Sequence, residues 1–313
     1  MELVIRNLTK QYPNKLAVDG VNLTLRPGVY GLLGANGAGK TTLMRMLCGI
    51  LHPTGGEITL DGLTVDQEDY RASLGYLPQD FGYYPGFTGM DFLLYLGALK
   101  GLPRPQAKAR AAELLSLVDI PNPDVRLKDY PFQFSGGMQQ RAMIAMGMSC
   151  NPDILICDEP TTALDVTVQA QVLEQLNQLR ERFGTALIII THNLGIVARY
   201  ADTVKIMYGG KIVEDGPTDE VFENPQHPYT LGLIRAVPRL DLPRSHGLYT
   251  IEGEPPDMSK IPPDCCAFHS RCKYADELCR SCRPQPEQVG ERHWCACFHR
   301  ELAQAEREEV LSI

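Results

Sequence analysis

Apolar and polar positions alternate through the first 33 residues, with turns at Pro13-Asn14 and at Arg26-Pro27-Gly28. Alternation with a period of two is typical of strands that bury one face. The pattern therefore predicts antiparallel strands that lead into a buried strand at Val29–Leu33. Another strand and turn are expected at 56–63, and a hairpin at 203–216 with Gly209-Gly210 as its turn.

Two short apolar runs, Ile154–Cys157 and Ala186–Ile190, are typical of strands buried inside a parallel sheet. Strands that alternate with helices favour an α/β fold with a parallel sheet. Helices are expected at about 41–51, at 88–118 with a break at 101–103, from Ser135 to about Cys150, and at about 167–183.

Composition and charge narrow the class of protein. The 313 residues are 44% hydrophobic and 22% charged, which is ordinary for a folded domain. No apolar run reaches about 18 residues, and the beginning MELVIRNLTKQY lacks the pattern of a secretory signal. The chain is therefore expected in the cytoplasm. A net charge of −8 argues against a nucleic-acid partner.

The strongest motif is a glycine-rich loop between the strand ending at Leu33 and the next helix. It reads GANGAGKT from Gly34 to Thr41 and matches G-x-x-x-x-G-K-[ST]. Such loops direct backbone N–H groups at phosphate oxygens, and the helix N-terminus adds positive charge. Lys40 would reach the β and γ phosphates of ATP, and Thr41 would bind Mg²⁺. The nucleotide-binding residues expected here are Gly34, Asn36, Gly37, Gly39, Lys40, Thr41 and Thr42.

An acidic pair follows the buried strand at 154–157. Asp158 would hold the magnesium ion, and Glu159 would polarise the attacking water. Two acidic residues often occur at the start of a helix, so this pair alone is weak evidence for catalysis. Together with the phosphate loop it predicts nucleotide hydrolysis.

The run Ser135-Gly136-Gly137-Met138-Gln139-Gln140 resembles the signature of ABC-type ATPases. Other elements of that family follow in its order, and each has a structural alternative, such as core packing or a helix cap. The resemblance covers about residues 1–238. It implies that Tyr12 stacks on adenine, that Gln79 senses magnesium and faces the transporter, that Asp165 lies in a loop crossing a dimer interface, and that His192 contacts the γ-phosphate.

The same resemblance implies a site shared between two chains. Ser135, Gly137 and Gln140 would contact the nucleotide of a second ATPase subunit, so hydrolysis would depend on a homo- or heterodimer. Transmembrane permease subunits would be the other partners. The expected fold is a P-loop NTPase of the ABC type: a parallel core sheet, an antiparallel β subdomain, and a helical subdomain at about 86–150. The ATPase domain is expected at 1–238 and a Cys-rich tail at 239–313.

The second half resembles the ATPases of oligopeptide and dipeptide importers. It shares DEPTTALDVTVQAQ from Asp158, NPQHPYT from Asn224 and AVPRL from Ala236. This family implies peptide import at the cytoplasmic face of the membrane. It also implies a 4Fe–4S cluster on Cys266, Cys272, Cys279 and Cys297, with zinc as the alternative ion. The spare thiols of Cys265, Cys282 and Cys295 could replace a ligand, and seven free thiols in a loose tail are the remaining possibility.

The other three cysteines, Cys48, Cys150 and Cys157, are expected to be buried small hydrophobes. The first half of the chain is similar to exporter ATPases of drugs, lantibiotics and polysaccharides, in its phosphate loop and in residues 74–102. The two resemblances meet near 105–130, and an exporter ATPase is the alternative function. A soluble ABC protein of translation or DNA repair would carry two P-loops or a coiled-coil insertion, and this chain has neither. An iron–sulfur redox protein would not need the complete hydrolytic set.

Overall fold

The structure is a computed structural model that describes residues 1–79, 84, 86–99, 101–162, 164–238, 249–262 and 264–311. The chain divides into two compact units. Unit 1 contains residues 1–3, 25–29 and 59–190, and unit 2 contains residues 4–24, 30–58 and 191–313. No helix among the described residues combines the length and the apolarity that a membrane crossing requires.

Unit 1 is built on three parallel strands, β6 (Leu74–Leu77), β7 (Ile154–Asp158) and β8 (Ala186–Ile190), with β7 in the middle. Every residue of β7 and β8 is buried, so both strands are apolar on both faces, as expected for a parallel sheet. The sequence pattern found β7 and β8 but missed β6. That strand is short, and Gly75 lies so close to the Gly147 carbonyl oxygen that a Cβ would approach it to 2.6 Å.

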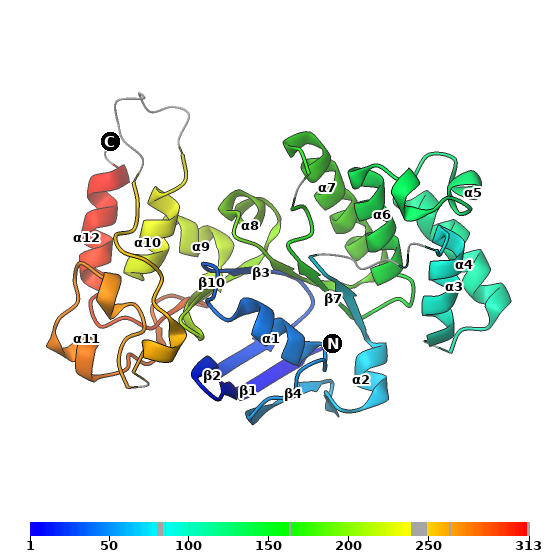
Figure 1. Cartoon of the computed structure of the whole chain (residues 1–313). Coiled ribbons are helices and arrows are strands. Elements are labelled where there is room, and N and C mark those ends of the chain that lie inside the picture. The colour runs from blue at the N-terminus through cyan, green and yellow to red at the C-terminus, as the bar shows by residue number, and fades with distance from the viewer. Residues whose placement is uncertain are drawn as a thin grey trace. The chain divides into compact units, whose positions relative to one another are not determined.

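Within unit 1, α3, α4 and α5 form a group to one side of β7 (Figure 1). α6 packs against β6, and α4 contacts both α3 and α6. The expected break at 101–103 separates α3 from α4, where Gly101 adopts φ 73°. The helices and the short strand of this unit are β5 (Leu63–Thr64), α2 (Glu68–Ala72), α3 (Gly89–Leu99), α4 (Arg104–Leu117), α5 (Pro123–Arg126), α6 (Gly136–Gly147) and α7 (Val166–Phe183).

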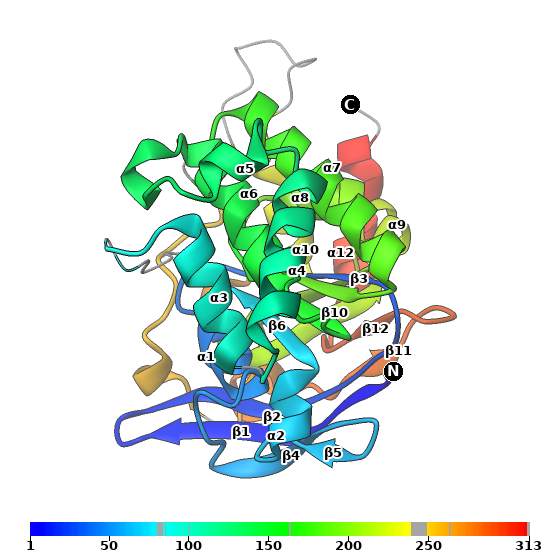
Figure 2. The same cartoon turned by 90° about the vertical axis from the view of Figure 1, so that its right-hand side faces the viewer.

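Unit 2 contains an antiparallel sheet in the order β2-β1-β4, seen in Figure 2. Its strands are β1 (Leu3–Tyr12), β2 (Lys15–Leu25) and β4 (Gly55–Leu60), whose last two residues belong to unit 1. The helix expected at 41–51 is α1 (Lys40–Leu47). It ends early because Gly49 adopts φ 68°, and the amides of Ile50 and Leu51 both turn back to the Arg45 carbonyl.

A second sheet in unit 2 has the order β11-β12-β10-β9-β3. β3 (Val29–Leu33) and β9 (Thr203–Tyr208) are parallel, and the predicted hairpin joins β9 to β10 (Lys211–Pro217). The Cys-rich tail supplies the next two strands, β12 (Trp294–Cys295) and β11 (Glu287–Gln288). The helices of this unit after α1 are α8 (Leu194–Tyr200), α9 (Thr218–Glu223), α10 (Pro228–Arg235), α11 (Glu277–Ser281) and α12 (Arg300–Leu311).

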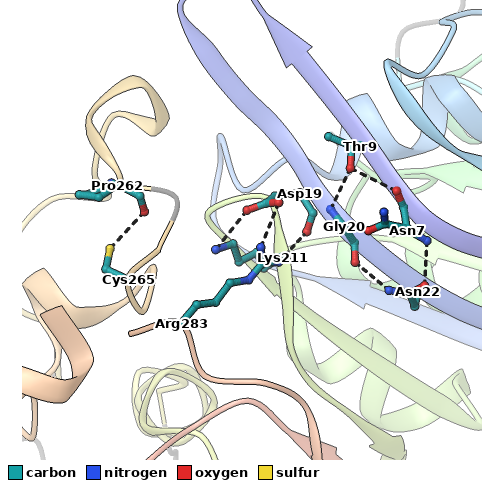
Figure 3. Close-up of polar contacts among 9 residues, drawn as sticks. All are labelled: Asn7, Thr9, Asp19, Gly20, Asn22, Lys211, Pro262, Cys265 and Arg283. Atoms are coloured by element: carbon teal, nitrogen blue, oxygen red, sulfur yellow. Dashed lines mark hydrogen bonds and ion pairs between the residues drawn. The ribbon is translucent and has the colours of Figure 1, made fainter. Parts of the chain in front are cut away.

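The tail shares a hydrophobic core with the rest of unit 2. Ala267 and Phe268 are buried in one cluster with Leu33, Tyr208 and Tyr229. Polar contacts add to this attachment, as Figure 3 shows. Asp19 of β2 accepts from the Arg283 guanidinium at 3.1 Å and pairs with the Lys211 ammonium at 3.1 Å. The division expected at 238 stays a prediction, because residues 239–248 lie outside the described part of the chain.

Candidate nucleotide and cysteine sites

The glycine-rich loop connects β3 to α1 within unit 2. A Cβ on Gly34 would lie 2.3 Å from the Met207 carbonyl oxygen, and a Cβ on Gly39 would lie 2.4 Å from that of Ala17. Only glycine therefore fits at these two positions. The Gly210 N–H donates to the Ala38 carbonyl at 2.9 Å, so the β9–β10 turn supports the loop from one side.

The residues of this loop that are predicted to bind phosphate differ in burial. The Lys40 ammonium is buried and donates to the carbonyl oxygens of Gly34 at 2.6 Å and Ala35 at 3.1 Å. Asn36, Gly37 and Thr41 are exposed, and Thr42 is half-buried. The N-cap residue of α1 is Gly39, which has no side chain to cap the first turn. The amides of that first turn are therefore suited to an anion.

Two further predicted residues belong to the same unit. Tyr12 is half-buried at the end of β1, and the ammonium groups of Lys10 and Lys15 lie 5.6 and 5.7 Å from its ring centroid. His192 is exposed and follows β8, where the Thr191 N–H donates to the Leu32 carbonyl at 3.3 Å.

The acidic pair lies at the end of β7 in unit 1. Asp158 is buried, and Glu159 has φ 49°, a conformation that non-glycine residues seldom adopt. The Glu159 N–H donates to Ile190 at 2.8 Å, and the Thr162 hydroxyl donates to its carboxylate at 2.7 Å. Strained backbone of this kind is concentrated at functional sites, so the outlier supports a catalytic role for Glu159.

The signature residues begin α6 in the same unit. The Ser135 hydroxyl accepts from the Met138 N–H at 3.4 Å, and the Asp165 carboxylate accepts from Val168 at 2.9 Å at the start of α7. Both residues are thus N-caps, which is the structural role considered for them. A Cβ on Gly137 would meet Val168 at 2.8 Å. Gln79 is exposed, and Gln140 is half-buried. Asp80 follows Gln79 in the chain, and Ala163 lies two residues before Asp165. Both residues lie outside the described part of the chain.

The predicted nucleotide site is therefore described in two halves. Unit 2 contains the phosphate loop, Tyr12 and His192, and unit 1 contains the acidic pair, Gln79, Asp165 and the signature. Cys157 is fully buried, and this burial raises the pKa of its thiol, as expected for a packing residue. Cys48 and Cys150 are only half-buried, so the expectation of full burial was wrong for them. Both lie just beyond a helix C-terminus, where packing is looser.

The tail brings the four predicted thiols into one cluster. The thiols of Cys266, Cys272 and Cys279 lie near that of Cys297 and raise its pKa further, after burial, which is the main cause. Burial raises the pKa of Cys266 to about 11 and that of Cys297 to about 12. The Cys266 N–H donates to the Cys279 carbonyl at 2.9 Å, and the His299 N–H donates to the Cys297 sulfur at 3.4 Å. The tail is thus folded around these thiols, which contradicts the alternative of a loose tail.

The spare cysteines differ from these four. Cys265 is buried, and its thiol donates to the Pro262 carbonyl at 3.2 Å (Figure 3). Cys295 is buried in β12, and Cys282 is exposed. Among the described residues, no three of the four clustered sulfurs lie within 4.8 Å of one another. Four sulfurs around one zinc ion would be about 4 Å apart, because Zn–S bonds measure about 2.3 Å.

A second set of ligands was missed from the sequence. One carboxylate oxygen of Asp276, the Cys279 sulfur and one ring nitrogen of His299 all lie within 4.8 Å of one another. The Cys279 backbone N–H is the main cause that lowers the pKa of Asp276 to about 2. His299 and Asp276 pair at 3.1 Å. In the sequence, only their nearness to Cys279 and Cys297 could have indicated Asp276 and His299 as ligands.

The buried imidazole of His227 should make the fold sensitive to acid. Its Nδ1 accepts from the Tyr229 N–H at 3.0 Å, and burial lowers its pKa from 6.5 to about 3. Because the unfolded chain takes up this proton first, the stabilisation is complete above pH 6.5 and is lost as the pH falls toward 3. We expect a loss on the order of a few kcal/mol in unfolding free energy over that range.

Denaturant unfolding at several pH values checks this expectation. His227→Asn keeps an acceptor that can cap the helix and removes the imidazole that titrates. The unfolding free energy of this variant should therefore be lower than that of wild type and should change less with pH. His52→Asn, at a histidine in the loop after α1, is the control. An equal slope in wild type and His227→Asn between pH 6.5 and 4 would contradict the assignment.

Two regions of the chain match known protein families. Residues 18–162 match the ABC transporter family, and residues 213–279 match the oligopeptide/dipeptide transporter C-terminal region. The oligopeptide transport ATP-binding protein OppD of Salmonella typhimurium is 41% identical over 282 residues, covering 86% of this chain and 84% of the relative. The dipeptide transport ATP-binding protein DppD of Bacillus subtilis is 38% identical, covering 90% of this chain and 88% of the relative.

Solved structures support the fold. A dimeric ATP-binding cassette in a post-hydrolysis state with ADP and phosphate has a TM-score of 0.62 and 25% identity, covering 69% of this chain and 98% of its own. The cbiO1 protein of Clostridium perfringens has a TM-score of 0.64 and 28% identity, covering 70% of this chain and 90% of its own. The P-loop ABC ATPase fold expected from the sequence is therefore confirmed. The chain belongs to the family of ATP-hydrolysing subunits of ABC transporters, in the group that carries the oligopeptide/dipeptide transporter C-terminal region.

Proposed function

We propose that this chain hydrolyses ATP to energise the import of oligopeptides or dipeptides, at the cytoplasmic face of the membrane. One observation carries the proposal: the ABC nucleotide motifs and the oligopeptide-transporter C-terminal region occur in one chain. Relatives whose names state oligopeptide or dipeptide transport align with 86% to 90% of it. Their similarity therefore includes the first half, which resembles exporters in places.

In this proposal the chain's residues divide the work on ATP. The loop amides from Asn36 onward, together with Lys40, bind the phosphates, and Tyr12 stacks on the adenine. Thr41, Gln79 and Asp158 hold Mg²⁺, which neutralises charge that develops on the phosphate oxygens. Glu159 polarises the attacking water.

Five further residues complete the proposed site. His192 contacts the γ-phosphate. Ser135, Gly137, Gln140 and Asp165 serve the nucleotide of a second ATPase subunit. Hydrolysis would then require a dimer. The N-terminus of α6 is exposed. Its Ser135 hydroxyl and backbone amides are suited to an anion, and in this proposal that anion is a phosphate of the nucleotide bound by the second subunit.

A cavity of about 340 Å³ in unit 1 suits a permease segment. Phe87, Phe92 and Met143 line it, and Gln79 and Gln140 lie at its wall. The exposed Tyr84 ring packs beside Phe87, with centroids 5.1 Å apart. Aromatic residues and methionine are enriched at protein interfaces. A permease bound here would contact both the magnesium-sensing Gln79 and the signature helix.

The four clustered thiols fit the proposed 4Fe–4S cluster. Cys266, Cys272, Cys279 and Cys297 come from separate segments of the tail, and backbone N–H groups donate toward their sulfurs. Thiolates with nearby amide donors are the ligands that iron–sulfur clusters use. The cluster would stabilise a tail that has few regular elements of its own.

Peptide uptake by cells tests the function. Deleting the gene should reduce uptake of a labelled tripeptide to background, and the wild-type gene should restore it. Lys40→Ala should not restore it, because the variant keeps the tail but binds the phosphates of ATP more weakly. Unchanged peptide uptake, with loss of resistance to an exported drug or antimicrobial peptide, would instead establish the exporter alternative.

A further inference from the structure

The hydroxyl of Tyr229 contacts the backbone of the phosphate loop. It accepts a hydrogen bond from the Ala35 N–H at 2.9 Å, across 194 residues of sequence. Tyr229 is 1% exposed, and burial is the main cause that raises its pKa to about 12. The phenol is therefore neutral at physiological pH. Both residues belong to unit 2.

This hydrogen bond holds the same peptide group that Lys40 uses. The Ala35 N–H and the Gly34 carbonyl form one planar trans peptide, so they point in opposite directions. The Lys40 ammonium donates to that Gly34 carbonyl at 2.6 Å. Tyr229 thus holds the peptide from its N–H side while Lys40 binds its oxygen. Rotation of the peptide would break both contacts at once.

Tyr229 itself is rigidly mounted. Its N–H donates to the buried His227 side chain, and the His227 N–H donates to the buried Glu214 carboxylate at 3.0 Å. Its ring packs against Tyr208, with centroids 4.6 Å apart, and against Phe268 of the tail at 5.4 Å. A fixed side chain is required for a residue that orients another group.

We propose that Tyr229 is a positioning residue for ATP binding: through the Gly34–Ala35 peptide it sets the orientation of Lys40. This role explains why Tyr229, in the segment NPQHPYT, contacts Ala35 of the phosphate loop although 194 positions separate the two residues in sequence. Phe268, which is close in sequence to Cys266, packs on the ring of Tyr229 and is thus connected to the phosphate loop through this one side chain. The proposal depends on ATP binding at the loop and is independent of the transported solute.

Tyr229→Phe in the full chain tests the role, because it keeps the ring and removes only the hydroxyl. Losing one buried hydrogen bond should weaken MgATP binding about threefold to tenfold in equilibrium titrations. The matched control is Tyr208→Phe. That residue is equally buried in the same ring cluster, but its hydroxyl lies 3.5 Å from the Arg271 guanidinium and not on the loop. Its ATP affinity should equal that of wild type.

A double-variant cycle separates positioning from general support of the fold. In a Lys40→Ala background, Tyr229→Phe should cause no further loss of ATP affinity, because the group it orients is gone. Equal losses in Tyr229→Phe and Tyr208→Phe would overturn the proposal. A full additional loss in the Lys40→Ala background would overturn it too, as would a lower melting temperature of Tyr229→Phe with unchanged ATP affinity.

Discussion

Glu159→Gln is expected to lower ATP hydrolysis at least about a hundredfold, the scale of a lost general base, while ATP binding is retained. The substitution keeps the shape of the side chain and removes the charge that polarises water. The amide oxygen can still accept from the Thr162 hydroxyl, which donates to the carboxylate at 2.7 Å. Steady-state phosphate release and nucleotide titration measure the two effects.

With hydrolysis blocked, ATP should also hold two chains together, which size-exclusion chromatography with MgATP would detect. Glu181→Gln is the control: it removes the same charge from an exposed position on α7, where Glu181 pairs with Arg180. Its turnover should match that of wild type. Near-normal turnover in Glu159→Gln would remove Glu159 from the catalytic role. Loss of ATP binding in that variant would show that the carboxylate supports the fold instead.

The strands and helices that the sequence predicted correctly are those with a strong apolar pattern. β7 and β8 are buried on both faces, so their apolar runs were unambiguous. α10 was missed although it carries Tyr229. Its eight residues begin with Pro228 and include Gly232, whose missing side chain admits Ile251 of the tail. Its stability comes from the His227 cap and from tertiary packing, which a local pattern does not record.

The candidate site shows the same division. Motif spacing identified the phosphate loop and the acidic pair because their chemistry depends on neighbouring backbone groups. Motif spacing did not select the four cysteines that the structure gathers; resemblance to the importer family selected them from the seven in the tail. Tyr229, Asp276 and His299 were not recognised. The partner of Tyr229, Ala35, lies 194 residues away in sequence. Asp276 and His299 come together only when the tail folds.

Protein purified without oxygen is expected to be brown, with broad visible absorption and about four irons per chain. Cys272→Ser should bleach it, since one of the four clustered thiols is lost. The tail should then become sensitive to protease, because a bound metal group couples its ligands to folding. The buried contacts of Ala267 and Phe268 place part of this tail inside the core of unit 2. Cleavage should therefore begin in the segments between the cysteines.

The neighbouring ligand set provides the control that separates iron from zinc. His299→Gln leaves all four thiols in place and removes one ligand of the group formed with Asp276 and Cys279. The variant should stay brown if a four-iron cluster is present. Colourless anaerobic protein with one zinc per chain, lost in His299→Gln and kept in Cys272→Ser, would assign the metal to that group instead. A tail without metal, in which all seven thiols react freely in the native state, would contradict both sites.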